Sequence, residues 1–400
     1  KITAKETLDY VLRDLTSVEG AFFSSEDADS EGEEGKFYLW TLEEIRNALP
    51  SELGDFAVKL FGVKNEGNYF ETQKGRKGKN ILTLALPLEQ IASESNSTVN
   101  EVIGKLGKTV NLLYQSREKR VHPARDDKVI VDWNGLMIAS LARASQVLGE
   151  EKFLIAAEKS ANFILTQMRT DDGSLFHRYA KGEKAILGFL DDYAFFVFGL
   201  IELYETCFNE KYLQDSVALT KMMIEEFWDN KKGGFFFTSK NGDSQIPRIK
   251  QIYDGAIPSG NSMALHNLLR LASLTDEVSF EEYANKLLKS FAADIKGYPM
   301  GHTFMLSALD FALGPSSNVV LAGELETKDT QAILAALRKN FLPNLTVKIA
   351  KTDSVNLSSQ SMIGYSKIDG KATVYVCKEQ MCLPPTNEIK KMLEYLHISQ

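Results

Sequence analysis

Hydrophobic residues recur at helical spacing through most of the chain. Over residues 4–15, for example, Leu8, Val11, Leu12 and Leu15 fall on one helical face. The same periodicity predicts further helices near residues 51–61, 87–94, 98–120, 133–148, 151–169, 190–207, 210–228, 261–274, 279–295 and 301–313. Runs of strand character are few before residue 315, so the pattern favours packed helices over a βαβ sheet.

A short unit punctuates these helices. It consists of Gly followed within a few residues by an aromatic side chain, and it occurs at 18–23, 65–70, 171–176 and 231–236. A polar loop and a new helical pattern soon follow in three of the four cases, which indicates an internal repeat of helix, Gly stop, short strand, loop and helix. Such units close into a ring of helical hairpins, and we expect the loops after Gly20, Gly173 and Gly233 at the same end of that ring.

Two local signals depart from the helical pattern. Residues 36–40 read as a short strand, and Thr41 to Glu44 form a capping box that begins the next helix. After a linker at 314–317, strands are predicted at 318–322, 346–349 and 372–377, and helices at 328–341 and 386–396. We therefore expect a helical domain over 1–314 and a small α/β domain over 315–400.

Composition narrows the classes of partner. The chain is 44% hydrophobic and 25% charged, with a formal net charge of -8. An acidic chain with only short basic runs argues against nucleic acid, which requires a clustered basic face. No apolar run is long enough to span a membrane, so no membrane partner is predicted.

The cysteines and the first residue bear on the cellular setting. Cys207, Cys377 and Cys382 are too few for a disulfide framework, which fits a reducing, cytoplasmic compartment. Four residues separate Cys377 from Cys382, and this spacing favours packing thiols, with a labile disulfide as the alternative. The chain opens on Lys1 and a helix follows at once, so we expect a fragment or processed chain without a signal peptide.

Four polar constellations are candidates for chemistry. The loop 26–34 holds six carboxylates in nine residues, of which Asp27 and Asp29 are candidates to grip hydroxyls or act as acid or base. The alternative is a solvated acidic loop. Farther on, Asp127 and Lys128 precede Trp133 and Asn134, which offer a stacking face and an amide. An internal ion pair, a helix cap at Asp132 and a core Trp are the structural alternatives.

The other two constellations open helices that are apolar all round, as inner helices of a ring are. Asp191 and Asp192 precede Tyr193, and a carboxyl there needs burial or a like-charged neighbour to act as an acid, because a helix N-terminus favours the ionised form. Asp254 leads through a Gly-rich loop to Ser259 and Asn261. Helix capping is the alternative for both segments.

The same stretches resemble a known family. The matching segments are 26–30, 34–38, 120–128, 133–137, 190–195, 254–262 and 375–377 with Cys382. They resemble the bacterial YyaL proteins and their animal relatives, the spermatogenesis-associated proteins that carry an N-terminal thioredoxin-like domain. The resemblance implies an (α/α)6 toroid similar to six-hairpin glycosidases and N-acylglucosamine 2-epimerases. It also implies that the thioredoxin-like domain and the first helical hairpins are missing here, so the ring is incomplete and the missing region is a partner.

The resemblance suggests a saccharide-like ligand in a central acidic and aromatic cleft. Epimerisation or isomerisation and glycoside hydrolysis are the candidate reactions, and a non-catalytic, redox-linked binding or scaffold protein is the alternative. Histidines act as acid and base in epimerases of this fold, which makes His177 and His302 candidates, although a lone His is more often structural. No His or Cys spacing suggests a metal site, and no cofactor is predicted.

The candidate site residues fall into two groups. The candidate catalytic residues are Asp191, Asp192, Asp27, Asp254 and His177. The candidate ligand-binding residues are Asp29, Asp127, Lys128, Trp133, Asn134, Tyr193, Ser259 and Asn261.

Overall fold

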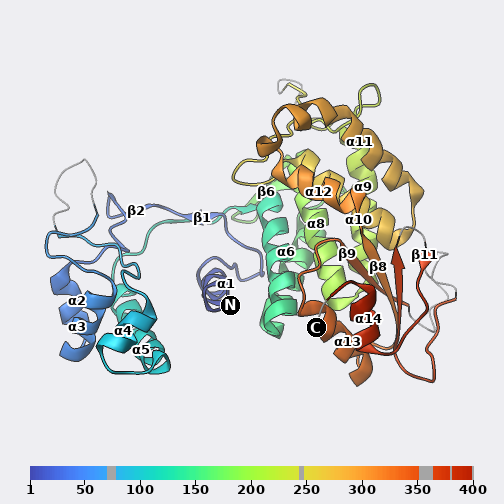
Figure 1. Ribbon diagram of the computed structural model, residues 1–400. Helices are drawn as coiled ribbons and strands as arrows, with labels where there is room; N and C mark the ends of the chain where they lie inside the picture. Colours follow the sequence, from blue (N-terminus) through green and yellow to red (C-terminus); the bar gives the residue numbers. More distant parts are fainter. Residues whose placement is uncertain (70–77, 243–246, 351–363, 379–380, 399–400) are drawn as a thin grey trace. The chain divides into compact units, whose positions relative to one another are not determined.

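The chain divides into two compact units, seen in a computed structural model that describes residues 1–69, 78–242, 247–350, 364–378 and 381–398 (Figure 1). Unit 1 comprises Lys1–Ser24 and Asp127–Gln400, and unit 2 comprises Ser25–Asp126. The domain boundary predicted near residue 315 falls inside unit 1. The division into domains 1–314 and 315–400 therefore stays a prediction. The hydrophobic core of unit 1 is continuous across it, because Val319 and Leu321 join the same buried cluster as the helices.

Unit 2 is a small helical unit with short strand pairs. Its elements are β1 (Ser25–Glu26), β2 (Asp29–Ser30), β3 (Glu33–Glu34), α2 (Leu42–Ala48), α3 (Ser51–Leu60), α4 (Leu88–Glu94), α5 (Val99–Arg117) and β4 (Arg125–Asp126). Thr41 and Glu44 form the expected capping box at α2. The strand predicted at 36–40 is wrong: Lys36 to Tyr38 form a turn, because the backbone of Tyr38 bonds back to Gly35, and only Trp40 makes a β-bridge, with Asn80.

Unit 1 is built from helical hairpins in two layers. The inner helices are α6 (Val131–Leu148), α8 (Leu190–Cys207), α10 (Gly260–Thr275) and α12 (Thr303–Leu313). The outer helices are α7 (Glu151–Gln167), α9 (Glu210–Phe227) and α11 (Val278–Gly297), with α1 (Ile2–Asp14) against α6 and the short 3-10 helix η1 (Pro299–Gly301) before α12. The inner helices α6, α8 and α10 each pack on the next inner helix and on their own outer partner, and α12 packs on α10. This layering confirms the predicted mainly helical, α/α-toroid class.

The inner helices α6 and α8 lie unusually close. A Cβ built on Gly135 would lie 2.4 Å from the carbonyl carbon of Phe195, and one built on Gly199 would lie 2.6 Å from the carbonyl oxygen of Gly135. Only hydrogen fits at these positions, so the two glycines set the spacing of the helices. The contact brings the N-terminal turns of α6 and α8 together.

A three-stranded sheet lies beside these turns; the repeat predicted a short strand after Gly173, but the sheet itself was not predicted. Its order is β5 (Val129–Ile130), β6 (Phe176–Ala180) and β7 (Glu183–Leu187), all antiparallel. The strands β6 and β7 are short and partly exposed, so they carry no strong alternation of buried and exposed residues to reveal them. Because β6 continues the third Gly-aromatic unit, it carries His177 to the start of α8.

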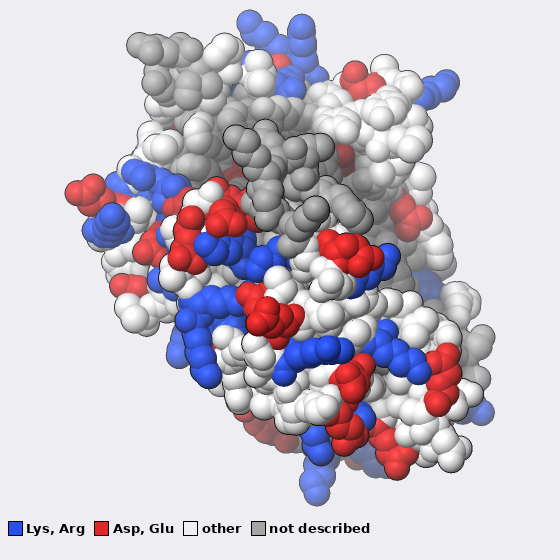
Figure 2. Space-filling model, turned by 90° about the vertical axis from the view of Figure 1, so that its left-hand side faces the viewer, with Lys and Arg blue, Asp and Glu red and all other residues white. Residues whose placement is uncertain are grey.

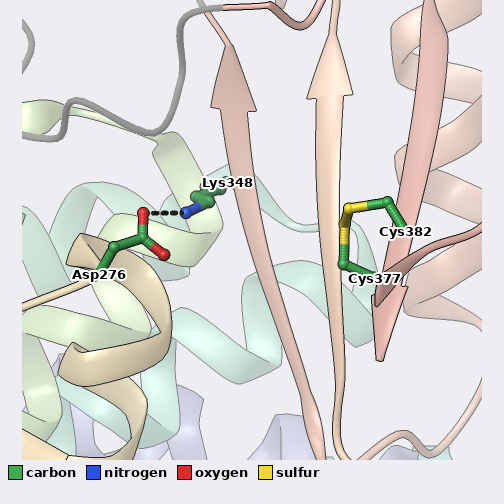
Figure 3. The surroundings of a disulfide bond; sticks show 4 residues. All are labelled: Asp276, Lys348, Cys377 and Cys382. Atoms are coloured by element: carbon green, nitrogen blue, oxygen red, sulfur yellow. Dashed lines mark hydrogen bonds and ion pairs between the residues drawn. A yellow bond between two sulfur atoms is a disulfide. The ribbon is translucent and has the colours of Figure 1, made fainter. Parts of the chain in front are cut away.

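The C-terminal part of unit 1 is the small sheet that the sequence predicted. Its order is β11 (Met381–Cys382), β10 (Thr373–Lys378), β8 (Ser317–Ala322) and β9 (Leu345–Ala350). The strands β8 and β9 are parallel and joined through α13 (Lys328–Arg338), whereas β10 is antiparallel to β8; α14 (Ile389–Tyr395) follows. The buried Lys348 of β9 pairs with Asp276 at 3.0 Å, at the end of α10 (Figure 3).

The two cysteines of this sheet form a disulfide bond. Cys377 on β10 lies opposite Cys382 on β11, and their sulfur atoms are joined (Figure 3). The expectation of packing thiols is therefore wrong, because the antiparallel pairing places the two residues directly across from each other. Cys207 is a free thiol at the end of α8.

Two surface properties complete the description. On the face drawn in Figure 2, Lys and Arg side chains are interspersed with Asp and Glu side chains. Among the helices that the structure describes, none combines the length and apolar character needed to cross a bilayer.

Candidate functional site

Two of the Gly-aromatic units are held by an asparagine at the start of an inner helix. The side-chain oxygen of Asn134 accepts the Phe22 amide at 2.8 Å, and its nitrogen donates to the Phe22 carbonyl at 2.9 Å. Asn261 makes the same pair of bonds with Phe235, at 2.8 and 2.9 Å. Both asparagines are buried, so these bonds satisfy backbone groups that would otherwise lie unpaired in the core.

The third unit uses a different side chain for the same purpose. The hydroxyl of Tyr193 in α8 accepts a hydrogen bond from the Leu175 amide at 2.9 Å. It takes the place that Asn134 has at the start of α6 and Asn261 has at the start of α10. The three units following Gly20, Gly173 and Gly233 therefore all lie at the N-terminal ends of inner helices, as the repeat predicted. The unit at 65–70 belongs to unit 2 and contains Phe70, which lies outside the described residues.

Four ionisable residues meet at this end of α6 and α8. Asp132 lies in the first turn of α6, Asp191 and Asp192 lie in the first turn of α8, and His177 lies on β6. The His177 Nδ1 is 3.0 Å from both carboxylate oxygens of Asp192. We call Asp132, His177, Asp191 and Asp192 the acid cluster.

Asp192 is the fixed centre of the acid cluster. It is fully buried, and its oxygens also accept the backbone amides of Asp132 at 3.1 Å and Phe189 at 2.8 Å. Three N–H donors, with that of His177 shared between the two oxygens, hold this carboxylate in a single orientation. The carboxylate in turn orients the His177 ring, with Nδ1–H facing Asp192 and Nε2 left for another partner.

The other two carboxyls of the acid cluster are poised near neutrality. Burial, followed by the charge of Asp192, raises the pKa of Asp132 from 3.8 to about 7. The same two causes, in the same order, raise the pKa of Asp191 from 3.8 to about 7. Burial and a like-charged neighbour therefore overcome the helix N-terminus, which by itself favours ionised carboxylates.

The imidazole of His177 responds in the opposite sense to the same charges. Burial disfavours its charged form, but the hydrogen bond to Asp192 and the charges of Asp192 and Asp132 outweigh it and raise its pKa. The His177 side chain keeps 23% of its surface exposed. An imidazole with a raised pKa and a ring that reaches solvent is suited to exchange a proton with a ligand.

Asp191 carries an unsatisfied atom. Its Oδ1 is buried and has no donor in good hydrogen-bond geometry among the described residues, although the nearby Gly260 amide partly offsets the rise of its pKa. It lies against the start of α10, where a Cβ on Gly260 would come within 2.2 Å of it. An unpaired buried carboxyl oxygen is costly, and protonation removes the charge that makes it so.

Several predicted site residues have structural partners instead. Asp254 is buried, and its two oxygens accept the amides of Ser259 at 2.9 Å, Phe304 at 2.8 Å and Met305 at 3.1 Å. Ser259 caps α10 by accepting the Ser262 amide. His302 is buried and bonds through Nδ1 to the Ile252 carbonyl. These are the capping roles weighed as alternatives from the sequence, and a ligand role for Asp254 and Ser259 stays a prediction.

The remaining predicted residues lie near solvent. Trp133 follows Asp132 and keeps 47% of its surface exposed, so it is not a core residue. Asp127 is exposed and Lys128 is half-buried. Asp27 and Asp29 are exposed in unit 2, where the Asp27 carboxylate accepts the Asp29 amide at 3.0 Å. The structure does not place these two relative to unit 1, so their part in a site stays a prediction.

Asp132 is the residue that sequence reasoning missed. It was weighed as a helix cap and left out of the candidate site residues, although an acid followed by an aromatic residue opens both α6 (Asp132, Trp133) and α8 (Asp192, Tyr193). Aligning the two inner helices by their roles in the repeat would have placed Asp132 beside Asp192. Its burial and raised pKa could not have been read from the sequence, because they depend on the close approach of α6 and α8.

The acid cluster also has the donors of a cation site. Among the described residues, Asp132, His177 and Asp192 are the one group of this kind, with ligand atoms within 4.8 Å of one another. The backbone amides of Trp133, Asp132 and Phe189 already donate to the carboxylates, however. Two helix N-termini add positive potential there, so the arrangement favours bound protons over a cation.

Comparison with known proteins gives one clear relationship. No family model matches the chain. It is 31% identical to human spermatogenesis-associated protein 20 over 98% of its length, and 32% identical to the rat protein over the same share. The chain is a homologue of part of these proteins. It spans about half of their length, 54% in each case. An uncharacterised protein of Caenorhabditis elegans is 29% identical over 96% of this chain, and the match covers 55% of that protein's length.

Solved structures give only distant, partial likenesses. A GH76 α-mannanase of Bacteroides thetaiotaomicron matches with a TM-score of 0.40 and 15% identity, over 55% of this chain and 59% of its own. A cellobiose 2-epimerase of Bacillus thermoamylovorans matches with a TM-score of 0.37 and 10% identity, over 73% and 72%. The resemblance to the spermatogenesis-associated proteins inferred from the motifs is thus confirmed, while the reaction has to be argued from the acid cluster.

Proposed function

We propose that the acid cluster is the acid–base centre of a carbohydrate-active site. The observation that carries this proposal is the pair of carboxyls, Asp132 and Asp191, whose pKa values lie near 7 beside a His177–Asp192 dyad. Groups that are half-protonated at working pH are the most effective proton donors and acceptors. The toroid class of the fold and the exposed Trp133 beside the cluster favour a saccharide as the ligand.

The roles of the residues follow from their exposure and partners. Asp192 touches no ligand, because it is buried and saturated with hydrogen bonds; it positions His177 and stabilises its charged form. His177 is the group that takes a proton through Nε2. Asp191, with its unpaired Oδ1, is the acid that returns one, and Asp132 is the second candidate for that step. Trp133 offers a flat apolar face on which a sugar ring can stack.

Epimerisation or isomerisation fits this geometry best. Both reactions remove a proton from a carbon next to a carbonyl and return a proton to the same carbon or its neighbour, which needs one base and one acid. Glycoside hydrolysis is the second candidate, with Asp132 and Asp191 as its two carboxyls. It is less favoured because it requires one of them to stay ionised, while burial and Asp192 disfavour that state for both.

The proposal is tested by solvent exchange. The protein is incubated in D2O with glucose, mannose, N-acetylglucosamine and cellobiose, and deuterium at C2 is followed by NMR. We expect exchange at C2 of at least one of these sugars. Asp191→Asn and His177→Gln should each lower its rate by about 100-fold or more, whereas Asp171→Asn, an exposed acid in a neighbouring loop, should leave it unchanged.

Hydrolysis is distinguished in the same samples. A panel of aryl glycosides is added, and the release of reducing sugar is measured. Release of reducing sugar without exchange at C2 would support glycoside hydrolysis instead of epimerisation. If no sample shows either C2 exchange or release of reducing sugar, the enzymatic proposal is wrong.

The Cys377–Cys382 disulfide favours one alternative, a redox-linked scaffold. In that case the toroid would present a partner to the thioredoxin-like region implied by the family resemblance, and it would have no chemistry of its own. C2 exchange is then absent from the unmodified protein, and weaker binding of the thioredoxin-like region to Cys377→Ser would favour this alternative. Full activity of that variant would separate the disulfide from catalysis.

A further inference from the structure

A cavity of about 560 Å³ lies in unit 1, apart from the acid cluster. Its walls come from the inner helices α6, α8, α10 and α12 on one side, and from α13 with the segment leading to β9 on the other. It shares no residue with the acid cluster. Cavities of this size commonly hold small molecules, burying most of their surface.

Most of the wall is apolar. Aromatic and aliphatic side chains line it from both sides: Phe198, Phe208, Phe304, Leu334, Leu337, Phe341, Leu342, Pro343 and Val347. The imidazole of His266 adds to this surface, because burial lowers its pKa to about 3 and keeps the ring neutral. Its ring packs edge-on against Phe198 and Phe304. An apolar body therefore fits the cavity better than a polar one.

The charges deep in the cavity compensate one another. The buried Arg270 pairs with Glu202 at 2.6 Å and also with Glu205. Arg143 pairs with Glu202 from the solvent side. Two guanidinium groups thus face two carboxylates, and the second oxygen of Glu205 accepts the Val347 amide at 2.8 Å. This network needs no further ion.

Arg338 is the charge that remains. It lies at the end of α13, in the cavity wall, and donates one hydrogen bond of 2.7 Å to the Thr206 carbonyl. Within the described part of the chain it has no carboxylate partner, and burial lowers its pKa. The last carbonyls of α8 supply only a partial negative charge. A half-buried guanidinium with most of its donors unused favours an anion beside it.

We propose that this cavity binds a small amphipathic carboxylate. Its apolar body lies against the phenylalanine and leucine side chains, and its carboxylate pairs with Arg338. The charge of Arg338 determines the sign of the head group, while the apolar wall determines the body. The proposal is independent of the chemistry assigned to the acid cluster.

The test uses decanoate as the probe and isothermal titration calorimetry on the full chain. We expect decanoate to bind, and decanol, which has the same body without the charge, to bind at least tenfold more weakly. Arg338→Met keeps the apolar stem of the side chain and should weaken decanoate binding at least tenfold. Lys339→Met, which removes the exposed neighbouring charge, should leave the affinity within about twofold.

Two results would overturn the proposal. One is the absence of decanoate binding up to about 5 mM, because a site built for this ligand should bind it more tightly than that. The other is equal affinity for decanol and decanoate in the unmodified protein, which would show that Arg338 does not read the charge. The second comparison needs no variant, so it decides the question even where Arg338→Met fails to fold.

Discussion

At the scale of single residues, similar side chains have different roles because their surroundings differ. Asp254 and Asp192 both accept several backbone amides, which ties them to the fold. Asp191 lies next to Asp192 in sequence but has an unpaired oxygen and a pKa near 7. A carboxyl that the backbone does not satisfy is the one left for chemistry.

The raised pKa values predict how stability changes with pH. Asp132 binds its proton with a pKa of about 7 when folded and about 3.8 when unfolded, so the native state holds more protons between these values. The protonated Asp132 carboxyl therefore stabilises the folded state. This stabilisation is fully present below pH 3.8 and is lost as pH rises through 7. Asp191 acts with the same sign, and so does His177, whose pKa is also raised.

Urea unfolding followed between pH 4 and pH 8 measures this dependence. In Asp132→Asn, the decline in unfolding free energy with rising pH should be smaller than in the unmodified protein by a few kcal/mol. Asp171→Asn serves as the control and should reproduce the original slope. An unchanged slope in Asp132→Asn would contradict the proposed protonation of Asp132.

At the scale of the elements, the acid cluster depends on the packing of α6 against α8. Gly135 and Gly199 let the two backbones touch, and this contact brings Asp132 within hydrogen-bonding distance of Asp192. The pinned Gly-aromatic units then fix the loops around the helix starts. Asn134, Tyr193 and Asn261 do this in three successive repeats, so the same kind of bond fixes the loops at the end of the ring that carries the cluster.

Gly135→Ala should push α6 and α8 apart. The added Cβ would lie 2.4 Å from backbone of α8, which cannot move aside as a side chain can. We expect a loss of about 2–4 kcal/mol in the free energy of unfolding, together with a loss of sugar turnover. Gly104→Ala is the matched control: it lies within α5, with nothing within 4 Å of its Cβ, and should raise stability by about 0.5–1 kcal/mol.

At the scale of the whole molecule, the chain has two separate large cores. One joins the helical hairpins to the C-terminal sheet of unit 1, and the other is confined to unit 2 around Trp40, Ile45 and Leu60. The two buried clusters share no residue. Each unit therefore has the apolar burial that cooperative folding requires.

Separate cores predict separate unfolding. Scanning calorimetry should resolve two transitions, and Ile45→Ala, at a fully buried position of unit 2, should lower only one of them. The free energy of unfolding of unit 2 should fall by about 2–4 kcal/mol. Ile138→Ala, fully buried in α6, should lower the other. A single transition shifted equally by both substitutions would show that the units unfold together.

The sequence by itself determined the helices, the repeat and the sheet at the C-terminus. These follow from local patterns: the apolar period of α6 to α12, the Gly stops, and the change to strand runs after residue 314. Asp191, Asp192 and His177 were also candidates from the sequence, because they stand at the start of an inner helix or next to the repeat, and their role in a site stays a prediction.

Only the tertiary structure decided which of these groups meet and in what state. Asp132 and His177 are 45 residues apart in the sequence, and the approach of α6 to α8 beside β6 brings them together. Their pKa values follow from burial and from mutual charge, which are properties of the packed interior. Packing likewise decided that Asn134 and Asn261 bond to the backbone, since an amide bonds equally well to a ligand, and their ligand role stays a prediction.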